Sequence, residues 1–428
     1  MSLRRYKQVE LPNGGKLYYV KNLINNSTVV DINFDCGSRC NKIEGLAHFT
    51  EHMFFTGTDK MTKEDIAKKY FDFIDVNAAT SLRYIYFNGQ LFTKEFADYL
   101  STVAMMITES TFSEENVEKE KPVVLQEIAR KKDKFKSLSG WALDYLMYGL
   151  PEYKYGNLGT EKSVNSIKSE DVKEYVNTYF VANNLEVFVT SPYSLRKVKK
   201  LVINNLESKL PVNKDFKKLT YYYHSVNHNN FYKVDTQDIP KNYVYVNFAL
   251  NRNRWDFEFK RKFGLVMDMV NDYSEGMLKK LRLEKSLTYS AGMSDSYWEE
   301  NGYVNFATEC DKKNINEIFT TLAEYIKEIV KNGFTQAQLD KAKRLYEYGE
   351  EVKEVKLKNL TGRLYQFKYY GKILDAKEAK KTIKETTLEE CNALLREVFE
   401  KPIVSCLVYG DAKKEEVMTK QEFNKLFK

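Results

Sequence analysis

The sequence predicts a protein of mixed helices and strands that is built as two similar domains. The chain is 428 residues long and 43% hydrophobic, which is enough for more than one core. Strand-like and helix-like stretches alternate through its first half. Residues 334–343 (FTQAQLDKAK) then echo residues 112–121 (FSEENVEKEK), and the strand-like residues 404–409 match residues 185–190. Self-similarity over so long a period indicates duplicated domains.

The first domain opens with two strands. Residues 16–20 and 28–34 are rich in the β-branched and aromatic side chains that favour strands. A helix that carries the motif described below follows them directly. Residues 62–65 (TKED) form a capping box, which predicts the start of the next helix. Residues 84–87 predict a further strand, and residues 93–109 a further helix.

A long charged helix comes next. Ser113 predicts its cap. Glu120 and Glu127, seven residues apart, lie on one face of this helix. Pro122 stands between them and predicts a kink, because proline removes a helical hydrogen bond.

Residues 207–220 predict a linker between the two domains. They contain Pro211 and several lysines, and they follow a basic helix. We therefore predict domains at residues 1–206 and 221–428.

Charge and cysteine content argue against several classes of protein. The formal net charge is +7, and the basic excess is spread along the chain, so nucleic-acid binding has little support. Polar sequence follows residues 1–5, and no apolar run approaches the about 20 residues that a membrane span needs. The five cysteines are an odd and sparse set, which fits reduced thiols. We expect a cytoplasmic protein.

Residues 48–52 (HFTEH) contain the clearest chemical motif of the chain. His48 and His52 are four positions apart, so on a helix both imidazoles lie on one face and can reach one metal ion. Zinc suits neutral imidazoles, and a catalytic zinc ion takes three protein ligands, so a third ligand must come from elsewhere. Glu51 stands beside His52, where it can act as a general base. The pattern is the inverted form of the H-E-x-x-H zinc motif.

Other interpretations stay open at this point. The two histidines could instead be hydrogen-bonded residues of an amphipathic helix. Cys36 and Cys40, shortly before the motif, are a candidate for metal binding or a disulfide, although their C-x-x-x-C spacing flanks a predicted strand end. His224 and His228 form a rival pair, but their Asn-rich surroundings have no helical pattern.

The sequence around the motif resembles the pitrilysin family of zinc peptidases, family M16, which includes insulin-degrading enzyme and mitochondrial processing peptidase. The resemblance lies in residues 37–39 (GSR), 45–47 (GLA) and 55–58 (FTGT). It implies an α+β fold of two similar domains of duplicated topology. Each domain would be a mostly antiparallel sheet covered by helices, as in one half of the family's clam-shell.

The resemblance also implies roles for residues of the long helix. Glu127, in residues 123–128 (VVLQEI), falls where the family has its third zinc ligand, and Glu120 resembles its auxiliary acid. A glutamate on a charged helix is otherwise a solvated residue. In the second domain Gly349 stands where Glu127 stands in the first, and no histidine follows His228, so the copy cannot hold the same metal.

Residues 281–290 (LRLEKSLTYS) of the second domain resemble the family's Arg/Tyr segment. The match implies that Arg282 and Tyr289 hold the substrate backbone. Ser286 stands in place of the family's usual glycine. Without the resemblance, such a pair would be structural by default.

Residues 77–81 (NAATS) resemble the segment that begins the family's substrate-binding edge strand. The match implies that Asn77 and Ala78 contact substrate, which would pair with the strand through main-chain hydrogen bonds.

The resemblance therefore implies a zinc-dependent endopeptidase that cleaves peptides or small unfolded polypeptides inside a chamber. Zn²⁺ would bind His48, His52 and Glu127, with Glu51 as the general base. The rival is a catalytically silent member that acts as a scaffold or substrate receptor, and the complete ligand set argues against it. Two such halves form the family's chamber, so we expect a homodimer, with a heterodimer with a paralogue as the alternative.

Overall fold

The structure is a computed structural model that describes residues 6–73, 75–132, 134–149, 156–218, 230–298, 300–354, 357–371 and 376–428. His224 and His228 lie outside these residues, as does the end of the predicted linker. The chain forms two compact units. Unit 1 is Met1–Asp133, Lys154–Tyr221 and Val352–Ile373, and unit 2 is Lys134–Tyr153, Tyr222–Glu351 and Leu374–Lys428.

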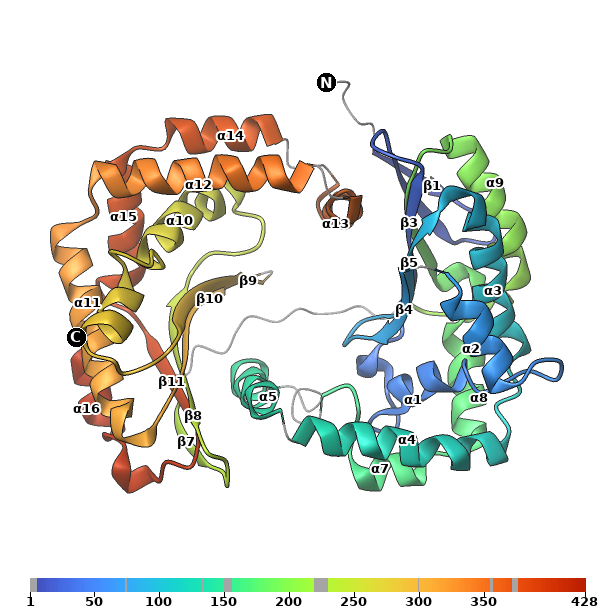
Figure 1. The fold of residues 1–428 in the computed structure, drawn as a ribbon, viewed down its shortest axis with the longest axis horizontal. Helices are drawn as coiled ribbons and strands as arrows, with labels where there is room; N and C mark the ends of the chain where they lie inside the picture. The colour runs from blue at the N-terminus through green and yellow to red at the C-terminus, as the bar shows by residue number, and fades with distance from the viewer. Residues whose placement is uncertain are drawn as a thin grey trace. The chain divides into compact units, whose positions relative to one another are not determined.

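Unit 1 contains a six-stranded, mostly antiparallel sheet (Figure 1). Its strands are β1 (Lys7–Glu10), β2 (Lys16–Lys21), β3 (Ser27–Phe34), β4 (Asp75–Thr80), β5 (Ile85–Phe92) and β6 (Leu185–Ser191). They stand in the order β1-β2-β6-β3-β5-β4, and only β2 and β6 run parallel. Buried and half-buried residues alternate along β5, as expected when one face of a strand meets a core. The sequence predicts β2, β3 and β6 to within one residue, and it predicts the first part of β5 but misses residues 88–92.

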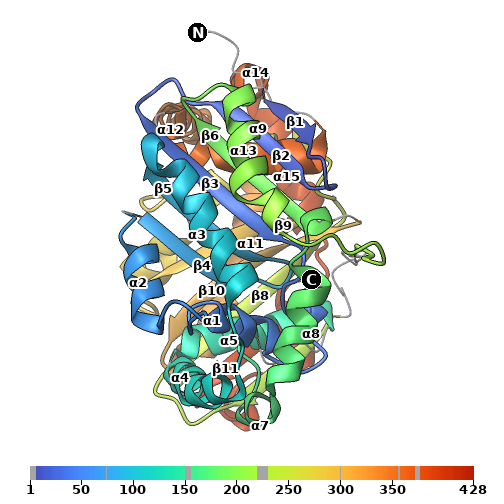
Figure 2. The ribbon, with the colours of Figure 1, turned by 90° about the vertical axis from the view of Figure 1, so that its right-hand side faces the viewer.

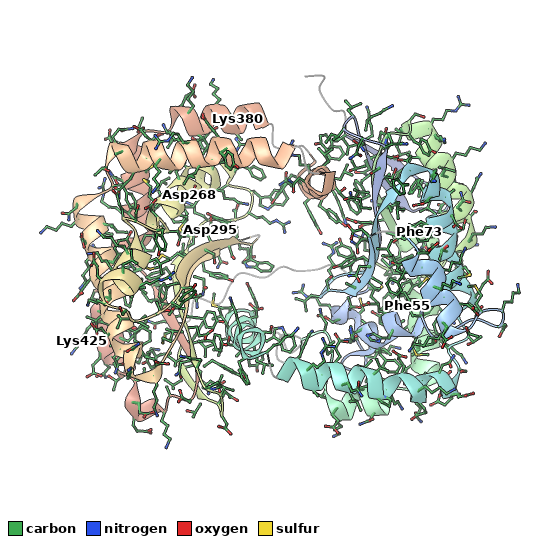
Figure 3. The ribbon with its side chains drawn as sticks, viewed as in Figure 1. Phe55, Phe73, Asp268, Asp295, Lys380 and Lys425 are labelled. Carbon is green, nitrogen blue, oxygen red and sulfur yellow. The ribbon has the colours of Figure 1, made fainter. Side chains whose placement is uncertain are left out.

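Helices cover one face of this sheet (Figure 2). They are α1 (Leu46–Met53), α2 (Lys63–Phe71), α3 (Phe96–Glu109), α4 (Glu114–Lys132), α7 (Glu161–Ser166), α8 (Ser169–Tyr179) and α9 (Leu195–Asn205). The core between helices and sheet is strongly aromatic. Phe180 packs against Phe34 and Phe54, each with ring centroids 4.7 Å away. Phe73, which Figure 3 labels, packs edge-on against Tyr99, with ring centroids 5.4 Å apart.

A helix from late in the chain covers the opposite face of the unit 1 sheet. This helix, α13 (Leu357–Tyr370), packs on β2, β3 and β6. The ring of Tyr365 stacks on Phe188 with centroids 4.0 Å apart, and Lys368 forms a buried ion pair with Glu186. Both faces of β6 are therefore covered, which explains why this strand is buried along its whole length.

Unit 2 repeats the arrangement of unit 1. Its strands are β7 (Tyr232–Thr236), β8 (Asn242–Leu250), β9 (Ala291–Tyr297), β10 (Gly302–Cys310) and β11 (Val404–Gly410). Their order, β7-β11-β8-β10-β9, matches that of unit 1 without β1, and again only one pair, β7 and β11, is parallel. The predicted duplication and the predicted α+β class are confirmed.

The helices of unit 2 are α5 (Phe135–Tyr148), α10 (Phe257–Val270), α11 (Ile315–Asn332), α12 (Gln336–Glu354), α14 (Ala376–Glu385), α15 (Leu388–Phe399) and α16 (Lys420–Leu426). Although α5 precedes residues 207–220 in the chain, it packs on the unit 2 sheet, where its Ser139 hydroxyl lies 2.7 Å from the hydroxyl of Tyr245. None of the described helices combines the length and apolar character that a membrane span requires.

The structure contains the helix-capping hydrogen bonds that the sequence predicts at Thr62 and Ser113. The Asp65 N–H donates to Thr62 Oγ1 at 3.2 Å and the Thr62 N–H to Asp65 Oδ2 at 3.0 Å, which is the predicted capping box. The Ser113 hydroxyl caps α4 by accepting from the Asn116 N–H at 3.1 Å. Pro122 lies inside α4, and the helix continues through it. The proline therefore leaves both glutamates on one helix.

Candidate metal centre

Helix α1 carries the H-x-x-E-H motif, and close backbone packing fixes where it begins. Its N-cap, Gly45, has φ +86°, in the left-handed region that favours glycine. A Cβ at this position would lie 2.4 Å from the carbonyl oxygen of Leu158. The Asn41 side chain then accepts a hydrogen bond from the Ala47 N–H at 2.8 Å, which satisfies a donor of the first turn. These contacts set the direction in which α1 presents its side chains.

Helix α1 lies beside helix α4 (Figure 1). His48 and His52 of α1 meet Glu127 of α4. Each Nε2 atom lies 3.5 Å from the same oxygen, Oε2 of Glu127. This separation is longer than a good N–H···O hydrogen bond. A tetrahedral ion with bonds of about 2.1 Å would hold its ligand atoms about 3.4 Å apart, so the spacing and the donor types fit zinc. Among the described residues, this is the group of donors that converges on one point.

Glu120 contacts the other nitrogen of His52. Its Oε1 lies 3.0 Å from His52 Nδ1, and its Oε2 accepts a hydrogen bond from Lys63 Nζ at 2.6 Å. A carboxylate in this position fixes the ring orientation and leaves Nε2 as the donor toward a metal. Nδ1 of His48, by contrast, is buried and has no hydrogen-bond partner among the described residues.

Glu51 lies beside the donor group without being part of it. The residue is 8% exposed, and its Oε2 accepts a hydrogen bond from Thr80 Oγ1 at 2.6 Å. Thr80 is the last residue of β4. The other carboxylate oxygen, Oε1, makes no hydrogen bond to a described residue. It can therefore accept a proton.

The protonation states of His48 and Glu127 suit a metal site, whereas His52 holds a proton that a metal would displace. Burial and the neighbouring imidazole lower the pKa of His48 to about 3, so its ring is neutral near pH 7. The facing ring of His52 lowers the pKa of Glu127 to about 2. Burial disfavours a charged His52, but the carboxylates around it outweigh burial and raise its pKa to about 9. His52 must lose that proton to bind a metal. Burial also raises the pKa of Glu51 above its ordinary value, which helps a general base hold a proton.

Strand β4, with the segment that resembles a substrate-binding strand, lies at an edge of the unit 1 sheet. Asn77 and Ala78 pair with Asn88 and Phe87 of β5, and no described strand pairs with the other side of β4. The Tyr70 hydroxyl donates to the carbonyl of Asn77 at 2.9 Å. An edge of this kind can accept an extended peptide.

Arg282 and Tyr289 lie together in unit 2. Arg282 belongs to the π-helix Lys279–Glu284, and its guanidinium carbon is 4.2 Å from the centroid of the Tyr289 ring. Tyr289 itself is 79% exposed. Ser286, between them, has φ +53°, so the backbone adopts a conformation that favours glycine. A glycine would adopt this conformation without strain.

The sequence does not predict two of these contacts, the one between Thr80 and Glu51 and the one between Lys63 and Glu120. The NAATS segment predicts a role for Asn77 and Ala78 but none for Thr80, and Lys63 carries only the signal of a capping box. The alternative donors Cys36 and Cys40 do not belong to the converging group. Burial raises the pKa of Cys36 well above its ordinary value, which disfavours the thiolate that a metal would need.

The fold and the site define a duplicated α+β protein with an inverted zinc motif in its first unit. The chain belongs to peptidase family M16. The family model described as "Insulinase (Peptidase family M16)" matches residues 19–146, and the model described as "Peptidase M16 inactive domain" matches residues 166–346.

Named relatives differ in the activity that their names state. The chain is 24% identical over 420 residues to "Uncharacterized zinc protease YmxG" of Bacillus subtilis (strain 168), an alignment that covers 94% of this chain and 98% of that protein. It is 20% identical to "Non-peptidase homolog YmxG" of Helicobacter pylori, over 76% and 74% of the two chains. The structure of the periplasmic protease PqqL from Escherichia coli superposes with a TM-score of 0.79 at 15% identity, over 99% of this chain and 50% of that chain. The last likeness concerns the fold alone.

Proposed function

We propose that the chain is a zinc-dependent endopeptidase that hydrolyses peptides or small unfolded polypeptides. The observation that carries this proposal is the convergence of donor atoms of His48, His52 and Glu127 within 4.8 Å of one another, with Glu127 Oε2 3.5 Å from each Nε2 atom. The buried carboxylate of Glu51 beside them adds a base. The relative from Bacillus subtilis that is named a zinc protease supports the same function.

The side chains of unit 1 divide the chemistry among them. His48, His52 and Glu127 would hold Zn²⁺, which when bound supplies Lewis acidity toward the scissile carbonyl and the attacking water. Glu51 takes a proton from the attacking water on its free Oε1 and passes it to the leaving amine nitrogen. Glu120 keeps the ring of His52 oriented through Nδ1.

Substrate recognition would rest mainly on the peptide backbone. An extended peptide would pair with β4 along Asn77 and Ala78, which gives affinity with little sequence preference. Arg282 and Tyr289 would hold the substrate backbone from the second unit. Their guanidinium and phenol groups are both hydrogen-bond donors, as carbonyl binding requires.

The Glu51→Gln variant tests this function. Glutamine keeps the shape and the hydrogen bond from Thr80 but cannot take a proton, so the variant should bind zinc as the wild type does and lose nearly all peptide hydrolysis. Zinc content and cleavage of a fluorogenic peptide are measured together. Glu115→Gln, an exposed glutamate on α4, is the matched control. Full activity in Glu51→Gln would show that Glu51 is not the base.

A second function is a catalytically silent scaffold or substrate receptor. The relative from Helicobacter pylori that is named a non-peptidase homolog favours this candidate. It predicts that the wild type binds peptides but does not cleave them, with or without added zinc. The same fluorogenic assay, combined with a binding measurement on an uncleaved peptide, separates the two functions.

We further propose a homodimer, in which the zinc unit of one chain and the Arg/Tyr unit of the other complete a site; a heterodimer with a paralogue is the alternative. The chain matches half of the PqqL chain, which supports pairing of two such halves. Inactive Glu51→Gln and inactive Arg282→Ala chains are mixed under conditions that exchange subunits. A mixed dimer then has one intact composite site only if the two residues act from different chains. Recovered activity supports the shared site, and no recovery despite exchange refutes it.

A further inference from the structure

We propose that Thr80 is a positioning residue for the general base and that it links the edge strand β4 to Glu51. The inference rests on the proposed function, in which Glu51 is the base. Its starting observation is the hydrogen bond of 2.6 Å from Thr80 Oγ1 to Glu51 Oε2.

This bond is the only hydrogen bond of the Glu51 carboxylate within the described part of the chain. It joins two elements that are far apart in sequence, because Glu51 stands on α1 and Thr80 ends β4. The hydroxyl is a donor here, since an ionised carboxylate can only accept. Hydrogen bonds to charged groups are short and about twice as strong as neutral ones. One carboxylate oxygen is therefore held, and the direction of the other, Oε1, is set with it.

The backbone of Thr80 is itself anchored. Its carbonyl accepts a hydrogen bond from Asn157 Nδ2 at 2.7 Å, and Asn157 Oδ1 accepts one from the Ser38 hydroxyl at 3.0 Å. Asn157 precedes Leu158, whose carbonyl oxygen packs against Gly45 at the start of α1. The same short segment thus braces both the end of the edge strand and the start of the motif helix. The position of the Thr80 hydroxyl relative to Glu51 follows from this bracing.

The arrangement makes substrate pairing and base orientation interdependent. A peptide that pairs with β4 orders the main chain that ends at Thr80. That main chain carries the hydroxyl that holds Glu51. Loss of the hydroxyl should therefore impair the proton transfer, which kcat reports. It should leave zinc binding unchanged, because the Thr80 hydroxyl bonds to Glu51 and makes no hydrogen bond to any of the three candidate ligands in the described structure.

The test compares Thr80→Val with Thr80→Ser in the full-length protein. Valine keeps the shape of threonine without the hydroxyl, and serine keeps the hydroxyl. We expect Thr80→Val to lower kcat about 10- to 100-fold, the effect of losing a hydrogen bond to a charged group, with KM within about threefold of the wild type and unchanged zinc content. Thr80→Ser should restore most of kcat. Thr178→Val, which removes a hydroxyl that bonds only within its own helix, is the control.

Two results would overturn the proposal. One is a kcat of Thr80→Val within twofold of the wild type, which means that the hydroxyl does not position the base. The other is a rise in KM with normal kcat, which means that Thr80 acts in strand pairing alone.

A second measurement does not depend on activity. Urea midpoints of Thr80→Val, Glu51→Ala and the double variant are compared with that of the wild type in the presence of a chelator. If the side chains are coupled, the shift of the double variant is smaller than the sum of the single shifts; additive shifts refute the link. If the wild type binds zinc but cleaves no peptide, the proposed function is refuted instead. The comparison of urea midpoints still decides whether Thr80 holds Glu51.

Discussion

Replacing Glu127 by alanine removes the one donor of the candidate zinc site that lies outside the motif helix. Its Oε2 lies 3.5 Å from Nε2 of each imidazole. The variant keeps only the two imidazole nitrogens, which is fewer than the three protein ligands of a catalytic zinc site. Four-ligand zinc sites have apparent binding free energies of about 10–16 kcal/mol, or roughly 3–4 kcal/mol for each ligand. Loss of Glu127 should therefore weaken zinc binding by about 100- to 1,000-fold.

Replacing Glu120 by alanine should have a smaller effect on zinc. Glu120 reaches the site only through Nδ1 of His52, and losing such an outer contact costs about 10- to 100-fold in metal affinity or activity. We expect Glu120→Ala to lose more activity than zinc, because the ring of His52 is still present but less well oriented. The two glutamates stand on the same helix, so the comparison controls for changes to α4.

A chelating fluorescent indicator competes with each variant for zinc and yields the dissociation constants. Glu115→Ala, which removes an exposed carboxylate from the same helix, should bind zinc as the wild type does. Equal affinity of Glu127→Ala and the wild type would refute the ligand assignment. A loss for Glu120→Ala as large as that for Glu127→Ala would mean that the two roles are assigned wrongly.

Three further predictions concern stability, each measured as the free energy of unfolding in urea. Ser286→Gly should raise it by about 0.5–1 kcal/mol, because φ is +53° there; a lower value would contradict the assigned strain. Gly45→Ala should lower it by about 3 kcal/mol or more, since a Cβ meets the Leu158 carbonyl, whereas Gly140→Ala, where a Cβ meets nothing within 4 Å, should raise it. Burial raises the pKa of Asp144 to about 6 from 3.8, so the ionised carboxylate destabilises the folded chain increasingly as the pH rises from about 4 to 6. Asp144→Asn should therefore raise the free energy of unfolding by about 1–2 kcal/mol at pH 7 and leave it unchanged near pH 4. Asp59→Asn, at an exposed site, is the control.

Local patterns predicted much of the fold. The β-branched and aromatic side chains of β3 and β5 and the capping box at Thr62 depend on residues close in sequence, so the sequence contains the whole signal. The proximity of His48 and His52 follows from helical spacing in the same way. Glu127 could be selected among many glutamates only through a family resemblance, because no local rule says which distant helix packs against α1.

Contacts between distant segments could not be predicted. The hydroxyl of Thr80 and the carboxylate of Glu51 are ordinary polar groups, and only the packing of α1 near the end of β4 brings them within 2.6 Å. The positions of α5 and α13 were missed for a related reason. An amphipathic pattern shows which face of a helix is buried but not which sheet it is buried against. Residues 207–220 have the composition of a linker, and one boundary between the compact units falls just after them, at residues 221/222. The units also divide the chain at residues 133/134, 153/154, 351/352 and 373/374.

The position of α13 affects the order in which the chain can fold during synthesis. Domains generally fold from the N-terminus as they leave the ribosome. Unit 1, however, needs residues 357–370 to cover the apolar side chains of Tyr18, Val20 and Phe188 on its sheet. A nascent chain that has emerged as far as residue 350 would still expose this face. We expect unit 1 to become resistant to proteolysis only when α13 has been translated, close to the end of the chain.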